Sequence, residues 1–143
     1  MSFDAALVRE QGVTFAVVVV ENHVASSDSS RRAAIADAYR TAAPDLRWHA
    51  AHDRHVYHLA VVRVAERDAF RAALAHAGVA TAVHYARALT QQPAYAPYVT
   101  AACPEAEAWA AECVSLPCFP ELTDAEVERV GSALAAYREG GVS

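Results

Sequence analysis

The sequence predicts an α/β fold of the α+β two-layer sandwich type, in which helices pack on a mixed or antiparallel sheet of about three to five strands. Two observations support this prediction. Segments whose apolar residues recur at helical spacing alternate along the chain with short, valine-rich runs. The composition, 55% hydrophobic and 20% charged over 143 residues, is typical of one globular domain with a single core.

The first elements are a helix and a strand. Residues 3–11 carry apolar side chains at helical spacing, and Gly12 is a natural stop, so a helix is expected there. Residues 13–21 contain four successive valines without polar alternation, which predicts a strand buried on both faces. A polar, serine-rich loop is expected over residues 22–30.

A second helix and strand follow. The helix is expected over residues 31–43, because its apolar positions repeat at three and four, with Ser29 or Ser30 as its cap and Pro44 as its end. The most regular strand pattern spans residues 55–64, where successive side chains are expected to alternate between the two faces of the sheet.

The central part of the chain predicts a third helix and strand and then a long connection. Residues 66–77 have an amphipathic pattern that Gly78 closes, and residues 79–85 read as a strand. Residues 87–102 are rich in tyrosine and proline, which favours an ordered loop with single turns.

The last elements are short and well marked. Residues 104–113 predict a helix with proline at an allowed early position, and residues 114–116 predict a brief strand. Thr123 and Glu126 have the spacing of a capping box, in which the side chain of each residue bonds the backbone of the other. The final helix is therefore expected to run from Thr123 to about Arg138.

Composition excludes several classes of function. The formal net charge is -5, and the basic residues form no clustered face of the kind that nucleic-acid binding needs. The longest apolar run, residues 15–20, is too short to span a bilayer. The three cysteines form no C-x-x-C pair and no leader pattern precedes them, so reduced thiols and a cytoplasmic location are expected.

A set of short motifs occurs in a fixed order over about three quarters of the chain. They are Arg31-Arg32-Ala33-Ala34-Ile35-Ala36, His55-Val56-Tyr57-His58-Leu59, Val61-Val62-Arg63-Val64, Glu66-Arg67-Asp68, Ala77-Gly78-Val79, Val83-His84-Tyr85, Gln92-Pro93-Ala94-Tyr95, Ser115-Leu116-Pro117 and Glu121-Leu122-Thr123-Asp124. Together they resemble the C-terminal, small domain of DegT/StrS-type sugar aminotransferases. That family acts on nucleotide-linked keto-sugars.

The resemblance implies the fold of the small domain of fold-type I aminotransferases for residues 29–138. Residues 1–28 show no likeness to the family and are expected to be a new helix–strand extension of one domain that spans residues 1–143. The large domain, which binds the family's cofactor, is not found in the sequence. The loop near the family's active site keeps its first histidine but has Ala86, Ala88 and Thr90 where the family usually has proline, proline and histidine.

All 12 basic residues are arginines, and the sequence contains no lysine. No side-chain amine is therefore present to form a Schiff base with a carbonyl substrate or with pyridoxal phosphate. The chain is not expected to work as an aminotransferase, and no cofactor is expected.

His84 and Tyr85 are the best candidates for catalysis. The resemblance places them at the edge of the family's active site, where a histidine can act as a general acid or base and a tyrosine can donate to an oxyanion. The alternative is that both are packing residues inherited from the larger enzyme.

The candidate binding residues are polar side chains on or near the same loop. Arg87 is expected to hold a carboxylate or phosphate, whereas Arg63, on a strand, is expected to form an internal ion pair. The other candidate binding residues are Tyr57, His58, Gln92 and Tyr95. For His58 the alternative is a buried histidine bonded to the backbone or to a tyrosine.

A metal site is not expected. His49, His52, His55 and His58 are spaced three apart, but His55 and His58 fall on opposite faces of the predicted strand. The remaining candidates have structural interpretations. Cys113 and Cys118 are expected to be buried and inert, and Trp48 and Trp109 are expected to anchor the core.

Two classes of function remain. The first is a small, pyridoxal-phosphate-independent enzyme of sugar- or antibiotic-type biosynthesis that performs cyclisation, dehydration or isomerisation at the old substrate loop. The second is a non-catalytic accessory subunit or ligand-binding module. Both cases predict a small-molecule substrate. Both also predict either self-association, as in a dimer, or docking on a larger biosynthetic protein. A fragment without function is disfavoured by the well-formed helix caps.

Overall fold

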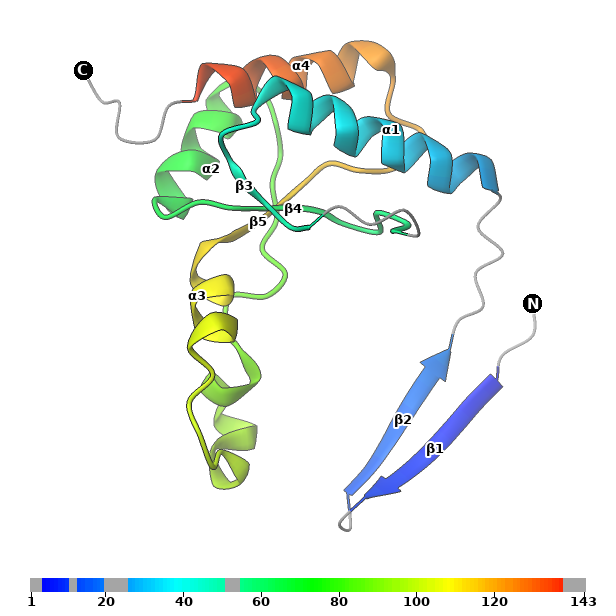
Figure 1. Ribbon diagram of the computed structural model, residues 1–143, viewed down its shortest axis with the longest axis vertical. Helices are drawn as coiled ribbons and strands as arrows, with labels where there is room; N and C mark the ends of the chain where they lie inside the picture. Colours follow the sequence, from blue (N-terminus) through cyan, green and yellow to red (C-terminus); the bar gives the residue numbers. More distant parts are fainter. Residues whose placement is uncertain (1–3, 11–12, 20–25, 51–54, 138–143) are drawn as a thin grey trace.

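The computed structural model describes residues 4–10, 13–19, 26–50 and 55–137 (Figure 1). Its elements, in chain order, are β1 (Asp4–Glu10), β2 (Val13–Val19), α1 (Ser26–Ala42), β3 (Arg47–Trp48), β4 (Ala60–Arg63), α2 (Arg67–His76), the 3₁₀ turns η1 (Leu89–Gln91) and η2 (Pro93–Tyr98), α3 (Pro104–Glu112), β5 (Cys113–Leu116) and α4 (Asp124–Ala136). No helix in these ranges is long and apolar enough to cross a membrane.

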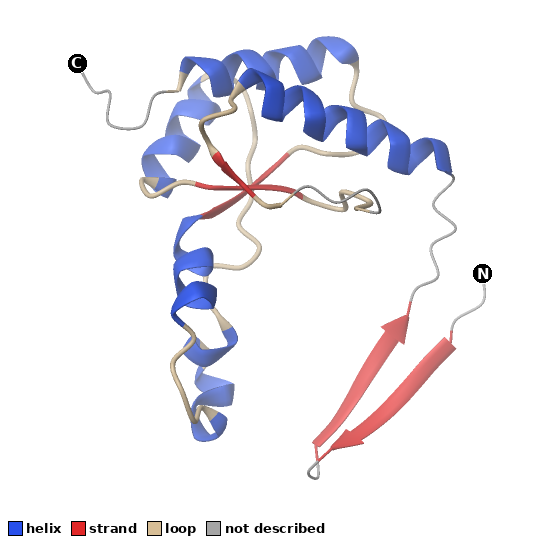
Figure 2. Ribbon diagram, in the orientation of Figure 1, coloured by secondary structure: helices blue, strands red, loops and turns tan. Residues whose placement is uncertain are grey.

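The central layer is an antiparallel sheet with the strand order β3-β4-β5. In its register, Ala60 lies opposite Leu116 and Arg63 lies opposite Cys113. Helices α1, α2 and α4 gather on one side of this sheet (Figures 1 and 2). The predicted α/β class and the antiparallel sheet are therefore confirmed.

The core lies between the sheet and this helical layer. Tyr39 of α1, Phe70 and Leu74 of α2, and Leu134 of α4 are no more than 1% exposed. The hydroxyl of Tyr39 donates to the carbonyl of Pro117 at 3.0 Å, so this buried polar group is satisfied. Burial raises the pKa of Tyr39, which keeps its hydroxyl protonated and able to donate.

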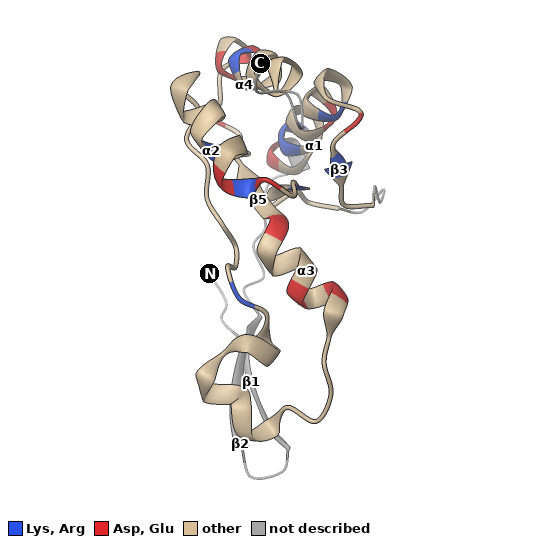
Figure 3. Cartoon of the chain, turned by 90° about the vertical axis from the view of Figure 1, so that its left-hand side faces the viewer, with Lys and Arg blue, Asp and Glu red and all other residues tan. Residues whose placement is uncertain are grey.

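Beyond the sheet, residues 85–112 form an arm that contains η1, η2 and α3. Figures 1 and 3 both show this arm extending away from the layer of α1, α2 and α4. The prediction of an ordered loop with single turns is confirmed, because η1 and η2 are separate 3₁₀ turns. The predicted helix at the end of the arm is also confirmed, and proline occupies its first position.

The helix predicted over residues 3–11 was wrong. Asp4–Glu10 forms β1, which pairs antiparallel with β2 over seven residues from Asp4↔Val19 to Glu10↔Val13. The two strands have equal length, so pairing satisfies backbone groups in both, and this overrides a weak helical spacing of apolar residues.

Helix α1 begins earlier than the sequence predicts. It starts at Ser26, so Ser29 and Ser30 lie inside the helix and the prediction that either caps it was wrong. Asp28 in the first turn complements the positive end of the helix dipole, which favours the longer helix.

Two predicted strands are shorter in the structure. Of residues 55–64, only Ala60–Arg63 forms a strand. The reason is a turn at Tyr57, whose backbone is left-handed with a φ of 47°. The backbone N–H of Tyr57 donates to Nδ1 of His55 at 2.9 Å. Residues 79–85 contribute only the bridge between Ala82 and Ser115. The strand alternation proposed for residues 55–59 is therefore absent.

The capping box of the last helix is confirmed. The hydroxyl oxygen of Thr123 accepts the Glu126 N–H at 3.3 Å, and the Glu126 carboxylate accepts the Thr123 N–H at 2.9 Å. The hydrogen bond from the Thr123 backbone, followed by the one from its hydroxyl, lowers the pKa of Glu126. The stability that this carboxylate provides is therefore present above its ordinary pKa and is lost as the pH falls through the lowered pKa.

Replacing Thr123 with alanine is expected to lower the free energy of unfolding by about 1 kcal/mol, because the first turn of α4 loses its side-chain acceptor. Urea unfolding followed by circular dichroism measures the change. Thr41→Ala is the matched control, since the hydroxyl of Thr41 donates only to the Asp37 carbonyl within α1. Equal losses in the two variants would contradict the role of the cap.

Candidate functional site

Strand β5 fixes the position of His84. Ala82 exchanges backbone hydrogen bonds with Ser115 at 2.8 and 3.1 Å, which holds the segment before His84 against β5. The hydroxyl of Ser115 then lies 2.9 Å from Nδ1 of His84. Within the described part of the chain, the other ring nitrogen of His84, Nε2, has no hydrogen-bond partner. His84 is thus oriented through one ring nitrogen, and the other ring nitrogen is left without a partner in the described residues.

The half-buried His84 side chain borders a hollow of about 510 Å³ between the loop after it and helix α3. The hollow is lined by His84, Tyr85, Arg87, Ala88, Leu89, Thr90, Gln92, Cys103, Ala106, Trp109 and Ala110. Four of the residues proposed from the sequence, His84, Tyr85, Arg87 and Gln92, therefore meet in one place.

The polar side chains of this hollow differ in how firmly they are held. The Tyr85 ring contacts the His84 ring edge-on at 5.7 Å between centroids, yet Tyr85 is 74% exposed. The amide of Gln92 donates to the carbonyl of Arg87 at 3.4 Å. The hydroxyl of Thr90, which stands where the family usually has histidine, donates to Glu107 of α3 at 2.8 Å and ties η1 to that helix.

The structure places the other three predicted binding residues outside this hollow. Tyr57 is buried, and its ring packs against His55 at 4.3 Å and His49 at 5.7 Å. Tyr95 is exposed on η2 and does not line the hollow. His58 is also exposed, so the alternative of a buried His58 bonded to a tyrosine does not hold.

His55 and His58 line one hollow together, so the prediction that they lie on opposite faces of a strand was wrong. His49, His55 and His58 all border a space of about 510 Å³, because the turn at Tyr57 ends the strand pattern. The His49 and His55 rings are stacked at 4.7 Å. Among the residues that the structure describes, no three metal-binding side chains are arranged to hold an ion, and His52 lies outside those residues.

Trp109 is the wall between the two hollows, a role that the sequence did not reveal. It borders both spaces and is only half-buried, so the prediction that it anchors the core was wrong. Trp48, in contrast, packs against the core as predicted. The Arg63 guanidinium lies 5.1 Å from the Trp109 ring centroid and pairs with Glu112 at 2.8 Å, which confirms the internal ion pair.

Ser115 was also missed, although the sequence carried a signal for it. Strand β5 is buried along its whole length, and Ser115 is the one hydroxyl-bearing residue in Cys113–Leu116. A polar side chain in a buried strand needs a hydrogen-bond partner, and here that partner is His84.

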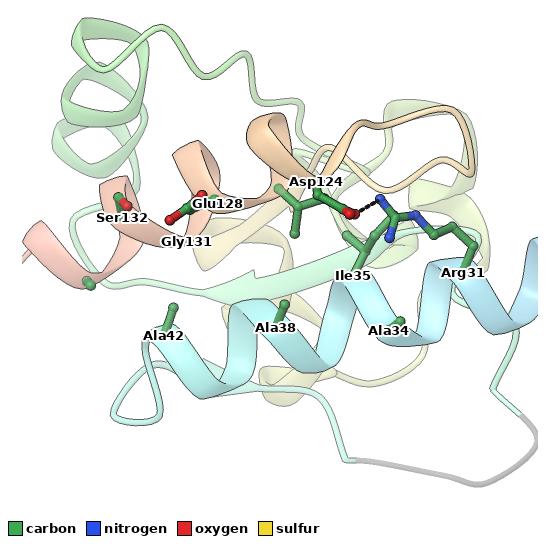
Figure 4. Close-up of a pocket in the computed structure, with 11 residues that line it drawn as sticks. Arg31, Ala34, Ile35, Ala38, Ala42, Asp124, Glu128, Gly131 and Ser132 are labelled. Carbon is green, nitrogen blue, oxygen red and sulfur yellow. Dashed lines mark hydrogen bonds and ion pairs between the residues drawn. The ribbon is translucent and has the colours of Figure 1, made fainter.

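The groove between α1 and α4 is a third hollow, of about 490 Å³ (Figure 4). Small side chains such as Ala38, Ala42 and Gly131 border most of it. The pair Arg31–Asp124, at 2.7 Å, closes one end. The rest of its lining consists mainly of small and apolar residues, which offer packing surface.

Cys113 and Cys118 are buried, as predicted, and only Cys103 is exposed among the three cysteines. Burial raises the pKa of the Cys118 thiol to about 11, despite the opposing effect of Arg32. Iodoacetamide at mildly alkaline pH is therefore expected to label Cys103 rapidly and to label the other two only after denaturation. Peptide mass spectrometry measures the order of labelling, and early modification of Cys113 or Cys118 would contradict the fold.

Comparison with known proteins places this chain in a family. The model of the DegT/DnrJ/EryC1/StrS aminotransferase family matches residues 14–135. The match begins inside β2, so it reaches into residues 1–28, a stretch whose motifs alone show no likeness to the family.

Individual relatives match over part of their length. The chain is 42% identical over 83 residues to the dTDP-3-amino-3,6-dideoxy-alpha-D-galactopyranose transaminase of Aneurinibacillus thermoaerophilus, covering 58% of this chain and 23% of that protein. It is 34% identical over 86 residues to the UDP-N-acetyl-3-dehydro-alpha-D-glucosamine 3-aminotransferase of Acidithiobacillus ferrooxidans, covering 60% of this chain and 23% of that protein. The chain thus spans about a quarter of these curated relatives.

Solved structures show the same partial coverage. DesV of S. venezuelae, solved with a ketimine intermediate, is similar with a TM-score of 0.72 and 31% identity, covering 82% of this chain and 33% of that chain. The aminotransferase TlmJ of Streptoalloteichus hindustanus is similar with a TM-score of 0.66 and 30% identity, covering 76% of this chain and 31% of that chain.

Proposed function

The chain belongs to the DegT/DnrJ/EryC1/StrS aminotransferase family, and we propose that it forms the substrate-facing part of a sugar-aminotransferase-type site that is completed by another polypeptide region. Pyridoxal phosphate would be held by that other region. The residues present here do not fit the cofactor, because none of the 143 residues is a lysine and a Schiff base needs a lysine amine. The observation that carries the proposal is the grouping of His84, Tyr85 and Arg87 around one open hollow.

The surface of the arm supports a protein partner. Among the described residues, the large exposed apolar side chains are concentrated there: Tyr85, Leu89, Tyr95, Tyr98 and Val99. Their exposed fractions run from 40% for Val99 to 74% for Tyr85. Exposed apolar and aromatic side chains gathered on one segment are typical of interaction surfaces. Two of them, Tyr85 and Leu89, also line the hollow, so a partner that covers the arm would close the site.

The residues of the hollow would have separate roles in such a site. His84, held at Nδ1 by Ser115, would accept or donate a proton at Nε2. The exposed hydroxyl of Tyr85 would donate a hydrogen bond to an oxygen of the substrate. The named substrate of one relative suggests a dTDP-linked amino sugar or its keto form as the ligand.

The test is to purify the tagged chain from its own host under mild conditions and to reduce the eluate with borohydride. We expect a co-purifying polypeptide with a pyridoxyl group fixed to a lysine. The pair is expected to transfer an amino group to a dTDP-linked keto-sugar. A matched bait with Leu89→Asp and Tyr98→Asp, which disrupts the apolar arm, is expected to lose the partner while keeping its circular dichroism spectrum. Capture that is unchanged in this bait, or a partner without pyridoxal phosphate, would contradict the proposal.

A second candidate function is favoured by one observation. The Ser115–His84–Tyr85 arrangement places an oriented imidazole beside an exposed phenol. These are the kinds of group that acid–base cyclisation, dehydration or isomerisation of a small carbonyl compound uses without a cofactor. In that case the isolated chain would turn over its substrate. His84→Ala and Tyr85→Phe would each lower that turnover, and unchanged turnover in both variants would exclude this function.

A further inference from the structure

We infer that Arg87 selects an oxyanion, a phosphate or a carboxylate, carried on a flat apolar group that packs against Leu89 and Trp109. The inference rests on the proposed function only in taking the hollow beside His84 as a small-molecule site. Arginine at position 87 then determines which class of ligand this hollow accepts.

Among the described residues, the charges around the arm are balanced except at Arg87. Arg63 is 8% exposed and is neutralised by Glu112 at 2.8 Å and Glu105 at 3.3 Å. Glu107, the acidic residue nearest in sequence to Trp109 on the same helix, accepts the hydroxyl of Thr90. Within the described ranges, the guanidinium of Arg87 has neither an acidic partner nor a hydrogen-bond acceptor. Arg87 is thus an exposed cation at the edge of the hollow without a counter-charge.

The walls of the hollow are largely apolar. Apart from His84, Tyr85, Arg87, Thr90, Gln92 and the Cys103 thiol, the lining is formed by alanine, leucine and tryptophan side chains. Thr90 and Gln92 are already engaged with Glu107 and with the Arg87 carbonyl. A ligand therefore meets one strong charge and a largely hydrophobic wall. Arginine binds phosphate and carboxylate in a bidentate manner, and an indole stacks well on a flat ring.

Trp109 is held in place by a neighbouring arginine. The Arg63 guanidinium lies over the Trp109 ring, 5.1 Å from the ring centroid. Arg63 is itself held by its hydrogen bond to Glu112. The indole therefore does not need to be ordered when a ligand binds, which reduces the entropic cost of binding.

The test measures binding by the isolated chain with defined probes: phenyl phosphate, benzoate, benzyl alcohol and inorganic phosphate. The indole N–H signals of Trp48 and Trp109 in a nitrogen–proton correlation spectrum report the site, since only Trp109 borders the hollow. We expect phenyl phosphate or benzoate to shift the Trp109 signal and leave Trp48 unchanged. Benzyl alcohol and inorganic phosphate, which each lack one half of the ligand, are expected to bind at least about tenfold more weakly.

Arg87→Gln is expected to weaken binding of the preferred probe by about tenfold or more. Arg129→Gln removes the same charge from α4, outside the hollow, and is expected to leave binding unchanged. Stronger binding of phenyl phosphate assigns a phosphate, and stronger binding of benzoate assigns a carboxylate. Equal effects of the two variants, or binding of benzyl alcohol as tight as that of the anions, would overturn the inference.

The outcome is separable from that of the proposed function. Binding that depends on Arg87 without any pyridoxal-phosphate-bearing partner would leave the inference standing and remove the proposed function. Capture of such a partner with no loss of binding in Arg87→Gln would do the reverse.

Discussion

Replacing Phe70 with alanine is expected to lower the free energy of unfolding by about 3–5 kcal/mol, because it removes a large buried side chain and leaves a cavity. Phe70 is fully buried in α2 and meets the Tyr137 ring edge-on at 4.8 Å between centroids. It therefore joins α2 to the end of α4. A loss of this size is a large fraction of the ~5–15 kcal/mol that stabilises a typical domain. Urea unfolding followed by circular dichroism measures the change.

Phe119→Ala is the control for this prediction, because Phe119 is 46% exposed and lies outside the core. We expect a loss below about 1 kcal/mol for that variant, since a partly exposed ring contributes little burial. Similar losses for Phe70 and Phe119 would show that the helical layer does not pack on the sheet as described.

The second large effect concerns Glu112. One carboxylate oxygen of Glu112 accepts from Nε of Arg63 at 2.8 Å and from Arg47 at 3.1 Å. Glu112→Gln leaves the buried Arg63 cation with only Glu105, whose side chain is 93% exposed. We expect the free energy of unfolding to fall by about 2–3 kcal/mol. This is below the ~3–5 kcal/mol for breaking a fully buried pair, because the Glu112 side chain retains some solvent contact.

The exposed pair Arg31–Asp124 supplies the matched control for Glu112→Gln. The side chain of Asp124 is 93% exposed, so Asp124→Asn is expected to cost less than about 1 kcal/mol. Thermal and urea unfolding of the two variants give the comparison. If Asp124→Asn were the more damaging change, the assignment of the Arg63–Glu112 pair as the buried link between β4 and α3 would be wrong.

The elements that the sequence predicts well are those with local end signals. Gly78 has a φ of 77° and follows α2, and Thr123 begins α4 with a complete capping box. These signals act over three or four residues, so they can be read without knowledge of the tertiary structure. The first strand and the start of α1 lack comparable signals. Apolar residues in 3–11 fit both a helix and a strand, and the pairing of β1 with β2 decides between them.

The strand predicted over residues 55–64 shows a different limit. Its pattern is regular, but the hydrogen bond from the Tyr57 N–H to His55 produces a left-handed turn that no periodicity indicates. For that reason the sequence placed His55 and His58 on opposite faces, whereas both border one hollow.

The candidate site was predicted in part. The grouping of His84, Tyr85 and Arg87 follows from their closeness in sequence and from the family resemblance. Ser115 lies on β5 and Trp109 lies on α3, more than twenty residues along the chain from His84, Tyr85 and Arg87. Their part in the site arises only when these two elements pack against the loop. Such contacts are set by tertiary packing, so the sequence could indicate only that a buried serine needs a partner.

The measurement that tests the central claim most directly is amino transfer to a dTDP-linked keto-sugar by three samples: the chain alone, its pyridoxal-phosphate-bearing partner alone, and the two together. The account predicts turnover only in the mixture. It also predicts that His84→Ala lowers that turnover without preventing assembly of the complex, which native mass spectrometry monitors. Turnover of a sugar or another carbonyl compound by the chain alone would contradict the account, as would full activity of the mixture with His84→Ala.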